Sequence, residues 1–299
     1  MIFLSWFIQC LLIFLSVAFF TLFERKIIGF FHNRLGPNKV SLSGLLQPLL
    51  DAFKLLTKQS LTPLQANKFA YGLAPLSSLF FCLFIWLTIP SFYYLISCNY
   101  SLVIFFCIGS LIVFSVLLAG WSSNSKYRLI GSLRSVAQSI SYESVFRTII
   151  VLVIFLFITF SIRSFYFQSS PLLLFIFPLW FICTLAETHR APFDFRESES
   201  ELVSGFNTEY SGAYFAFIFL SEYGVLLYSC LLISFLFFSF FLPFNTLLYV
   251  IIALLISFLI TWVRITFCRF RYDMLIITSW KVLLPFSLLI FILCVFIII

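Results

Sequence analysis

Residues 69–125 read FAYGLAPLSSLFFCLFIWLTIPSFYYLISCNYSLVIFFCIGSLIVFSVLLAGWSSNS, and no charged side chain occurs among them. A transmembrane helix needs about 20 consecutive apolar residues, so this run is long enough for two spans. Turn-forming residues near Pro90 and Asn99 would separate them. We therefore expect membrane-spanning helices at about residues 69–90 and 102–121.

The composition extends this prediction to the whole chain. It is 63% hydrophobic and 10% charged, whereas soluble domains are roughly 25% charged. The first apolar run ends at Glu24, and a cleaved signal would instead have basic residues before a shorter apolar core. We expect an all-α polytopic membrane protein that forms a single integral membrane domain over residues 1–299, with about eight transmembrane helices. The remaining expected spans are residues 2–23, 136–162, 171–187, 211–236, 247–263 and 282–299.

The basic residues are distributed unevenly between the expected loops. Sixteen of the eighteen lysines and arginines lie in loops that follow odd-numbered spans, and only Arg147 and Arg163 do not. Loops rich in basic residues stay on the cytoplasmic or matrix side of a membrane. We therefore expect both chain termini on the opposite, non-matrix side. The net charge of +7 is dispersed at span ends, so we expect no nucleic-acid partner.

An amphipathic surface helix is expected at about residues 41–58, SLSGLLQPLLDAFKLLTK. Apolar side chains recur there at helical spacing on one face, and polar or charged ones occupy the other. Pro48 lacks a backbone donor, so the regular helix should begin near it. Two roles are open: the helix roofs a lateral opening for a lipid-soluble molecule, or it is a peripheral anchor.

Cysteines and glycines give no sign of a bound redox group. The eight cysteines are scattered and form no CxxC pair, which argues against a disulfide framework or an iron–sulfur site. None of the ten glycines forms a GxGxxG or GxxxxGK nucleotide-binding motif. A metal site built from His189 and nearby acids has no ligand-spacing signature. We expect no metal, and flavin, nicotinamide and clusters would have to belong to partner chains.

The stretch ETHRAPFDFRESESELVSGFNTEY, residues 187–210, holds six of the eleven acidic residues. Glu187 would end the fifth span, where the negative end of the helix dipole and partial burial favour the protonated carboxyl. Three further acids in five residues would titrate as a group if they shared a dry site; they are Glu197, Glu199 and Glu201. A proton relay is the functional interpretation, and a solvated acidic loop is the alternative.

Three more acids lie within the expected spans or at their ends. Glu143 would lie inside the fourth span, with Arg147 four residues later as an ion-pair partner, and a structural pair and a relay member remain equally open. Glu222 would lie about three turns into the sixth span, where an acid is a functional candidate by default. Glu24 follows the first span, and a stop-transfer anchor with Arg25 and Lys26 would explain the basic residues but not the acid.

Five segments resemble those of the family of NADH-ubiquinone oxidoreductase chain 1, the core membrane subunit of respiratory complex I. They are ERKIIGFFHNRLGPNKV (24–40), GLLQPLLDAFKLLTK (44–58), LAGWSSNSKYRLIGSLRSVAQSISYE (118–143), AETHRAPFDFRESESELVSGFNTEYSG (186–212) and RFRYDMLIITSWKVLLP (269–285). The resemblance implies a multi-pass subunit of the mitochondrial inner membrane, with a bacterial plasma membrane as the alternative. It also implies ubiquinone as substrate, FMN and iron–sulfur clusters in partner subunits, and contacts with membrane-arm and hydrophilic-arm subunits.

The resemblance assigns roles residue by residue. It implies a quinone entrance near Arg25, Arg34 and Asp51. It implies a proton relay formed by Glu143, Glu187, Glu197, Glu199, Glu201, Glu209 and Glu222. Supporting charged or polar groups would be Glu24, Arg134, Tyr142, Arg190, Asp194, Arg271 and Asp273.

The chain also departs from the family pattern. His189 stands where the family usually has Asn, Arg196 and Ser198 flank Glu197 where small residues are usual, and residues 211–214 lack the customary Pro. Arg147 replaces an apolar residue. The two extra arginines would lower the proton affinity of neighbouring acids.

These residues together predict a subunit that binds ubiquinone and couples its reduction by NADH to proton translocation. A secondary ion transporter using the same acids, a membrane subunit of a related membrane-bound hydrogenase and a passive structural anchor are the alternatives. Transporters often contain inverted repeats with paired broken helices, and the sequence shows no such symmetry.

Overall fold

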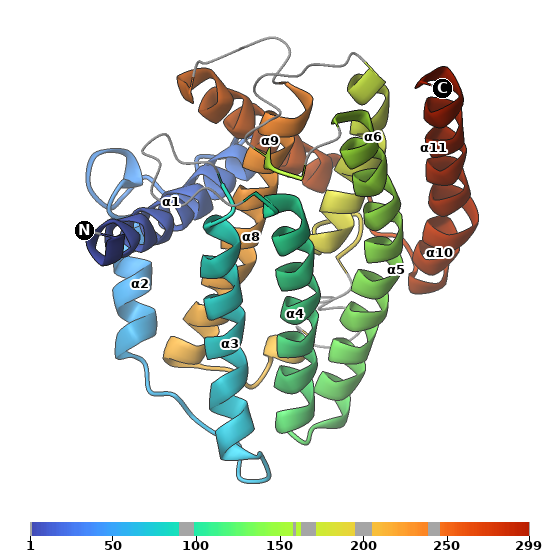
Figure 1. Cartoon of the computed structure of the whole chain (residues 1–299). Helices are drawn as coiled ribbons and strands as arrows, with labels where there is room; N and C mark the ends of the chain where they lie inside the picture. The colour runs from blue at the N-terminus through green and yellow to red at the C-terminus, as the bar shows by residue number, and fades with distance from the viewer. Residues whose placement is uncertain are drawn as a thin grey trace.

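The computed structural model describes residues 2–89, 99–157, 160–162, 172–194, 205–238 and 246–298. All regular secondary structure in these ranges is helical, as Figure 1 shows. The predicted all-α class is confirmed.

The main helices are α1 (Ile2–Phe31), α3 (Lys68–Trp86), α4 (Ser101–Ser122), α5 (Lys126–Phe157), α6 (Leu172–Glu187), α8 (Gly212–Phe237) and α9 (Thr246–Thr266). The C-terminal segment comprises α10 (Tyr272–Ile277), the π-helical turn η5 (Thr278–Leu283) and α11 (Leu284–Ile298). Within the described ranges, seven helices are long and apolar enough to cross a membrane, and α6 is a shorter apolar helix. The chain is therefore a multi-pass membrane protein.

The helices form one bundle around a buried core. Helix α3 packs against α4 and α8, α4 packs against α5, and α5 packs against α6 and α11. Helices α3, α4 and α5 run side by side in Figure 1, with α1 and α2 at one edge of the row and α11 at the other. The core between α5, α6 and α8 includes the fully buried Trp180, Tyr142 and Tyr228. Three helices thus surround the interior in which the acidic side chains of α5, α6 and α8 meet.

The expected surface helix is present as α2 (Gln47–Thr57), preceded by the 3-10 turn η1 (Leu42–Gly44). Pro48 lies in its first turn and is buried, so the regular helix begins where the proline predicted. Helix α2 packs against α1 and α8. Its outward face exposes Phe53 and Leu56, as suits a helix lying in a membrane surface.

Helices α1 and α5 extend well beyond the expected spans, and the last helical segment begins at Tyr272 rather than at residue 282. Helix α5 begins at Lys126, and only residues 123–125 separate it from α4. Hydropathy alone predicts a loop for the polar residues 126–135. They are helical because several of their polar side chains are buried, Arg128 and Ser135 among them. Helix α1 continues through Glu24 to Phe31 because Glu24 is buried among partners from distant parts of the chain.

Candidate functional site

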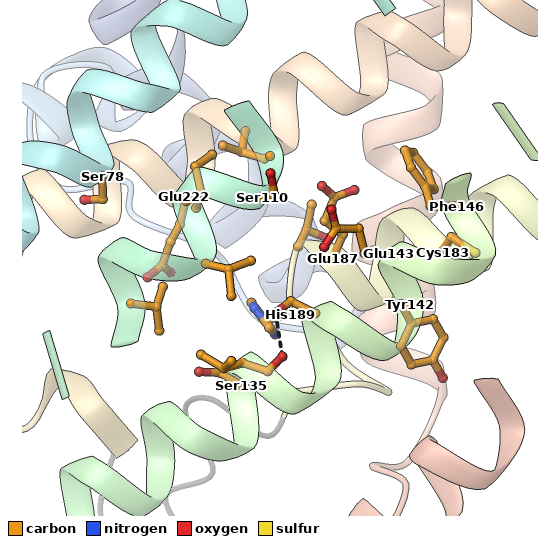
Figure 2. A pocket seen from close by; sticks show the side chains of 18 of the residues that line it. Ser78, Ser110, Ser135, Tyr142, Glu143, Phe146, Cys183, Glu187, His189 and Glu222 are labelled. Carbon is orange, nitrogen blue, oxygen red and sulfur yellow. Dashed lines mark hydrogen bonds between the residues drawn. The ribbon is translucent and has the colours of Figure 1, made fainter. Parts of the chain in front are cut away.

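A cavity lies within the bundle and is lined by side chains from α3, α4, α5, α6 and α8. Three carboxyl groups line it: Glu143 from α5, Glu187 from the end of α6 and Glu222 from α8. Glu143 and Glu187 lie next to each other, with Glu222 farther along the cavity (Figure 2). The structure thus brings three predicted relay acids to one cavity.

Glu143 is tied to its own helix. Its Oε1 atom lies 2.6 Å from Nη2 of Arg147, in the i,i+4 arrangement that the spacing predicted. The Arg147 side chain is largely exposed, whereas that of Glu143 is mostly buried. The pair therefore holds the Glu143 carboxyl against an arginine of its own helix.

Glu187 is the last residue of α6, and a buried amide holds the end of that helix in place. The fully buried Gln138 of α5 donates from Nε2 to the carbonyl oxygens of Ala186 at 3.0 Å and Phe193 at 2.8 Å. The Glu187 carboxyl forms no hydrogen bond or ion pair with the part of the chain that the structure describes. Gly109 of α4 passes near it, and a Cβ atom there would lie 3.7 Å from its Oε1. Glu187 is therefore positioned by backbone contacts while its carboxyl faces the cavity.

A second, more polar cavity adjoins the first. Thr188, His189 and Glu222 line both cavities. Arg190, Asp194, Tyr223 and Arg264 are among the other side chains that line the second. Its lining is rich in arginine, whereas the described lining of the first cavity contains none.

Glu24 anchors one wall of the second cavity. It is only 4% exposed and forms ion pairs with Arg190 at 3.2 Å and with Arg264. Tyr223 donates its hydroxyl to Glu24 Oε2 at 2.8 Å. Burial opposes charge on Arg190, but the Glu24 carboxylate more than offsets it and raises the pKa of Arg190 above its ordinary value. The cluster therefore holds a buried glutamate and an arginine in their charged forms, which a stop-transfer anchor would not require.

Asp194 receives its counterion from the last loop. Arg269 Nη2 lies 3.2 Å from Asp194 Oδ2, and the Phe270 amide donates to the Pro192 carbonyl at 3.1 Å. The last loop therefore supplies the counterion of this acid.

The other predicted supporting residues lie near α10. Arg271 and Asp273 pair with each other at 3.4 Å on the exposed surface. The Arg134 guanidinium lies over the Tyr272 ring at 5.8 Å. Tyr142 lines the first cavity, is buried, and donates to the Leu275 carbonyl at 3.3 Å. Of these residues, Tyr142 belongs to the cavity and the arginines and Asp273 lie outside both cavity linings.

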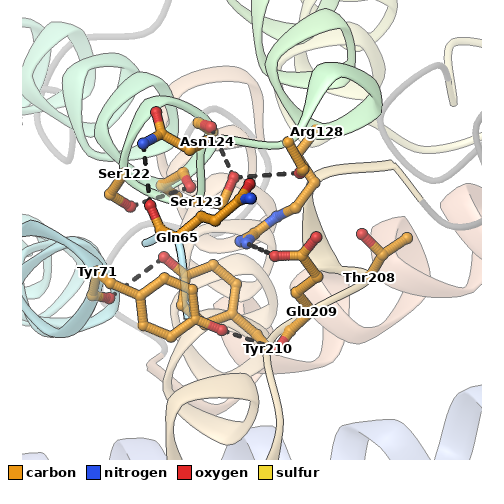
Figure 3. Close-up of polar contacts among 12 residues, drawn as sticks. Gln65, Tyr71, Ser122, Ser123, Asn124, Arg128, Thr208, Glu209 and Tyr210 are labelled. Atoms are coloured by element: carbon orange, nitrogen blue, oxygen red, sulfur yellow. Dashed lines mark hydrogen bonds and ion pairs between the residues drawn. The ribbon is translucent and has the colours of Figure 1, made fainter. Parts of the chain in front are cut away.

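Glu209 lies apart from the other acids, in the network shown in Figure 3. Its Oε2 atom is 3.1 Å from Nη1 of Arg128, whose side chain is fully buried. The guanidinium lies over the rings of Tyr210 at 4.4 Å and Tyr71 at 5.5 Å, and those rings stack with centroids 4.3 Å apart. Tyr71 also donates its hydroxyl to the backbone oxygen of Glu209 at 2.8 Å.

Tyr210 completes this network. Its hydroxyl donates to the Tyr71 carbonyl oxygen at 3.2 Å. Burial raises its pKa, which keeps the phenol protonated and able to donate. The network fixes Glu209 to α3 and α5 rather than directing it into either cavity.

The residues predicted at a quinone entrance are on the surface beside α1 and α2. Arg25 Nη1 pairs with Asp51 Oδ2 at 2.8 Å, and Gln47 donates to Asp51 Oδ1 at 3.0 Å. Arg34 is exposed in the turn that follows α1. The structure thus brings Arg25 and Asp51 together. The predicted relay acids Glu197, Glu199 and Glu201, together with Arg196, lie outside the described residues.

Several site residues were missing from the residues predicted from sequence, among them Gln138, Arg128, Arg264 and His189. Gln138 and Arg128 resemble ordinary polar loop residues in a hydropathy plot, and Arg264 resembles a membrane-edge anchor. His189 gave the clearest signal, a titratable side chain two residues after Glu187. Among the described residues no group of three His, Cys, Asp or Glu side chains could hold a metal ion.

Comparison with known proteins agrees with the resemblance drawn from the sequence motifs. A family model described as NADH dehydrogenase matches residues 4–295. The chain is 47% identical over 278 residues to NADH-ubiquinone oxidoreductase chain 1 of Aedes aegypti, which covers 91% of this chain and 88% of that protein. It is 46% identical over 291 residues to the protein of the same name from Artemia franciscana, covering 95% and 94%. For that of Heterololigo bleekeri the identity is 44% over 290 residues, covering 94% and 92%. The chain therefore belongs to the NADH dehydrogenase family.

Proposed function

We propose that the chain is a quinone-binding core membrane subunit of respiratory complex I, located in the mitochondrial inner membrane. The animal relatives at 43–47% identity, which are named NADH-ubiquinone oxidoreductase chain 1, support this assignment. The structural observation that carries it is the convergence of Glu143, Glu187 and Glu222 on one cavity within a membrane-spanning bundle. Acids at such positions are costly and are typical of proton pathways.

In this proposal the chain contributes to NADH:ubiquinone reduction without binding NADH. FMN and iron–sulfur clusters belong to partner subunits of the membrane and hydrophilic arms. Ubiquinone enters from the bilayer beside α1 and α2, where Arg25 and Asp51 pair at the surface. The exposed apolar side chains of α2 offer a lipid-compatible approach to this point.

Coupling depends on how differently the cavity acids are held. Glu143 is paired with Arg147, and Glu24 is held charged by two arginines. Glu187 has no such partner among the described residues, so a nearby change in charge alters its protonation most readily. Quinone reduction changes the charge near these groups, and Glu187 passes that change to Glu143 and Glu222 as a shift in proton occupancy.

The assignment is tested by gentle solubilisation of membranes followed by separation of intact assemblies. The chain is expected to co-migrate with flavin, iron–sulfur clusters and NADH:ubiquinone reductase activity. A photoreactive ubiquinone analogue should label the chain, and excess ubiquinone should suppress the labelling. Isolation of the chain in assemblies without flavin, with full ion transport retained, would overturn the proposal in favour of a secondary transporter.

A further inference from the structure

Gln138 joins helix α5 to the turn that carries Glu187. Its side chain is fully buried, and its Nε2 group donates to the carbonyl oxygens of Ala186 at 3.0 Å and Phe193 at 2.8 Å. The first acceptor directly precedes Glu187, and the second lies six residues after it. A single amide on α5 therefore holds both ends of the turn that follows α6.

The turn itself is held together by backbone hydrogen bonds. The Arg190 amide donates to the Leu185 carbonyl oxygen at 3.1 Å, and the Phe193 amide donates to the Arg190 carbonyl oxygen at 2.8 Å. These bonds keep residues 185–193 together as one folded unit. A contact that fixes this unit against α5 therefore also fixes the backbone from which the Glu187 side chain projects.

The orientation of the Gln138 amide follows from its two partners. Both are carbonyl oxygens, which only accept hydrogen bonds, so the amide must face them with its NH₂ group and not with its oxygen. The Oε1 atom accepts no hydrogen bond from the described part of the chain. The two carbonyl contacts are therefore the hydrogen bonds that the described structure gives this side chain.

Helix α5 also carries the neighbouring acid of the cavity. Glu143 lies five residues after Gln138, which is about 7.5 Å along a helix axis. Its carboxyl group lies next to that of Glu187 (Figure 2) and is held by Arg147 of the same helix. The Glu187 carboxyl has no such partner among the described residues. Its position relative to Glu143 therefore depends on how the backbone of its turn is attached to α5.

We propose that Gln138 is a positioning residue that holds Glu187 close enough to Glu143 for a change in proton occupancy of one acid to affect the other. This inference rests on the proposed function. Gln138 lines neither cavity in the described part of the chain, and its amide does not titrate in the physiological range. It acts through the Glu187 carboxyl and carries no proton itself.

The first test replaces Gln138 with Met, which has a similar length and volume but donates no hydrogen bond. Thr148→Val is a matched control on the same helix. It removes the 2.7 Å hydrogen bond between Thr148 and Ser287 of α11, and Thr148 lines neither cavity in the described structure. NADH oxidation by a water-soluble acceptor that bypasses the quinone reports assembly. Proton pumping and quinone reduction are measured per assembled enzyme.

Gln138→Met is expected to retain NADH oxidation by the soluble acceptor and to lose about tenfold or more in proton pumping, because displacing a reacting group by about 1 Å can cost about 100-fold in rate. Thr148→Val should pump like the wild type. Gln138→Asn keeps the amide on a side chain one methylene shorter, so its pumping should be intermediate, and it gives the same comparison if Gln138→Met does not assemble. Wild-type pumping in both Gln138 variants, or an equal loss in Thr148→Val, would overturn the proposal.

A double variant separates positioning from a general structural role. If Gln138 acts through the Glu187 carboxyl, adding the Gln138 substitution to Glu187→Gln should lower pumping no further than Glu187→Gln alone, because residues that act as a unit are not additive. Two losses that multiply would contradict the proposal. A loss in Glu187→Gln with none in the Gln138 variants would overturn this inference alone, whereas normal pumping in Glu187→Gln would overturn the coupling role on which it rests.

Discussion

Glu24 illustrates how a charge inside an apolar helix is held by the fold. Its three partners lie 166, 199 and 240 residues away along the chain. Burying an acid here requires compensation by charged or hydrogen-bonding groups, and the structure supplies two arginines and a tyrosine.

Replacing Glu24 with Gln should strongly destabilise the chain. Two arginines would lose their carboxylate, and breaking a buried ion pair costs about 3 to 5 kcal/mol. We expect a lower yield of assembled protein and a lower temperature of thermal inactivation. Asp273→Asn, which breaks an exposed pair with Arg271, should cost at most about 1 kcal/mol. Equal stability of these two variants would contradict the role assigned to Glu24.

Arg128 should matter more for stability than its place in a polar stretch suggests. Arg128→Met removes both the Glu209 pair and the contacts with two tyrosine rings. Arg128→Lys keeps the charge but lacks the planar group that stacks on aromatic rings. Thermal inactivation should therefore occur at the lowest temperature in Arg128→Met and at an intermediate one in Arg128→Lys. Wild-type stability in Arg128→Met would show that the network contributes little.

Local contacts were predictable from sequence and distant ones were not. The Glu143–Arg147 pair follows from helical spacing, and the start of α2 follows from Pro48. The partners of Glu24 and the burial of Arg128 depend on packing between distant segments. No pattern within a single helix contains that information.

At the scale of helices, α3 packs closely on α8, on the side of the bundle away from α11. A Cβ atom on Gly224 of α8 would lie 2.5 Å from the Cys82 sulfur of α3. Trp86 donates its indole N–H to the Gly224 carbonyl at 3.1 Å, and Thr88 and Tyr228 form a hydrogen bond of 2.6 Å. Glycine at this position permits the close approach of the two helices.

Gly224→Ala is expected to destabilise the pair by about 1 to 3 kcal/mol through overpacking. The double variant with Cys82→Ala should recover most of this loss because the sulfur is removed. Both effects would be measured as shifts in thermal inactivation of the assembled protein. Failure of the double variant to recover stability would place the strain elsewhere.

Helix existence was easier to predict than helix limits. Hydropathy identified the apolar segments that correspond to all seven long helices and α6. It did not predict the first ten residues of α5 as part of a span, because they carry polar side chains, and a hydropathy plot assigns polar residues to a loop. Some of these side chains are in fact buried, such as Arg128 and Ser132. It likewise ended the first span at residue 23, whereas α1 continues to Phe31.

For the whole molecule, the bundle joins acids from three helices that are distant in sequence. Helix α6 is short, and its end places Glu187 inside the bundle, where α5 and α8 contribute Glu143 and Glu222. The sequence singled out these acids as functional candidates, and the family resemblance grouped them. Their meeting in one cavity, and the second cavity beyond His189, follow only from the packing.

The most direct test of this account is proton pumping by assembled Glu187→Gln protein. The amide keeps the size of the side chain but does not exchange protons in the physiological range. We predict wild-type NADH oxidation with a water-soluble acceptor and a loss of about tenfold or more in proton pumping, with part of the activity retained in Glu187→Asp. Normal pumping and normal quinone reduction in Glu187→Gln would contradict the account.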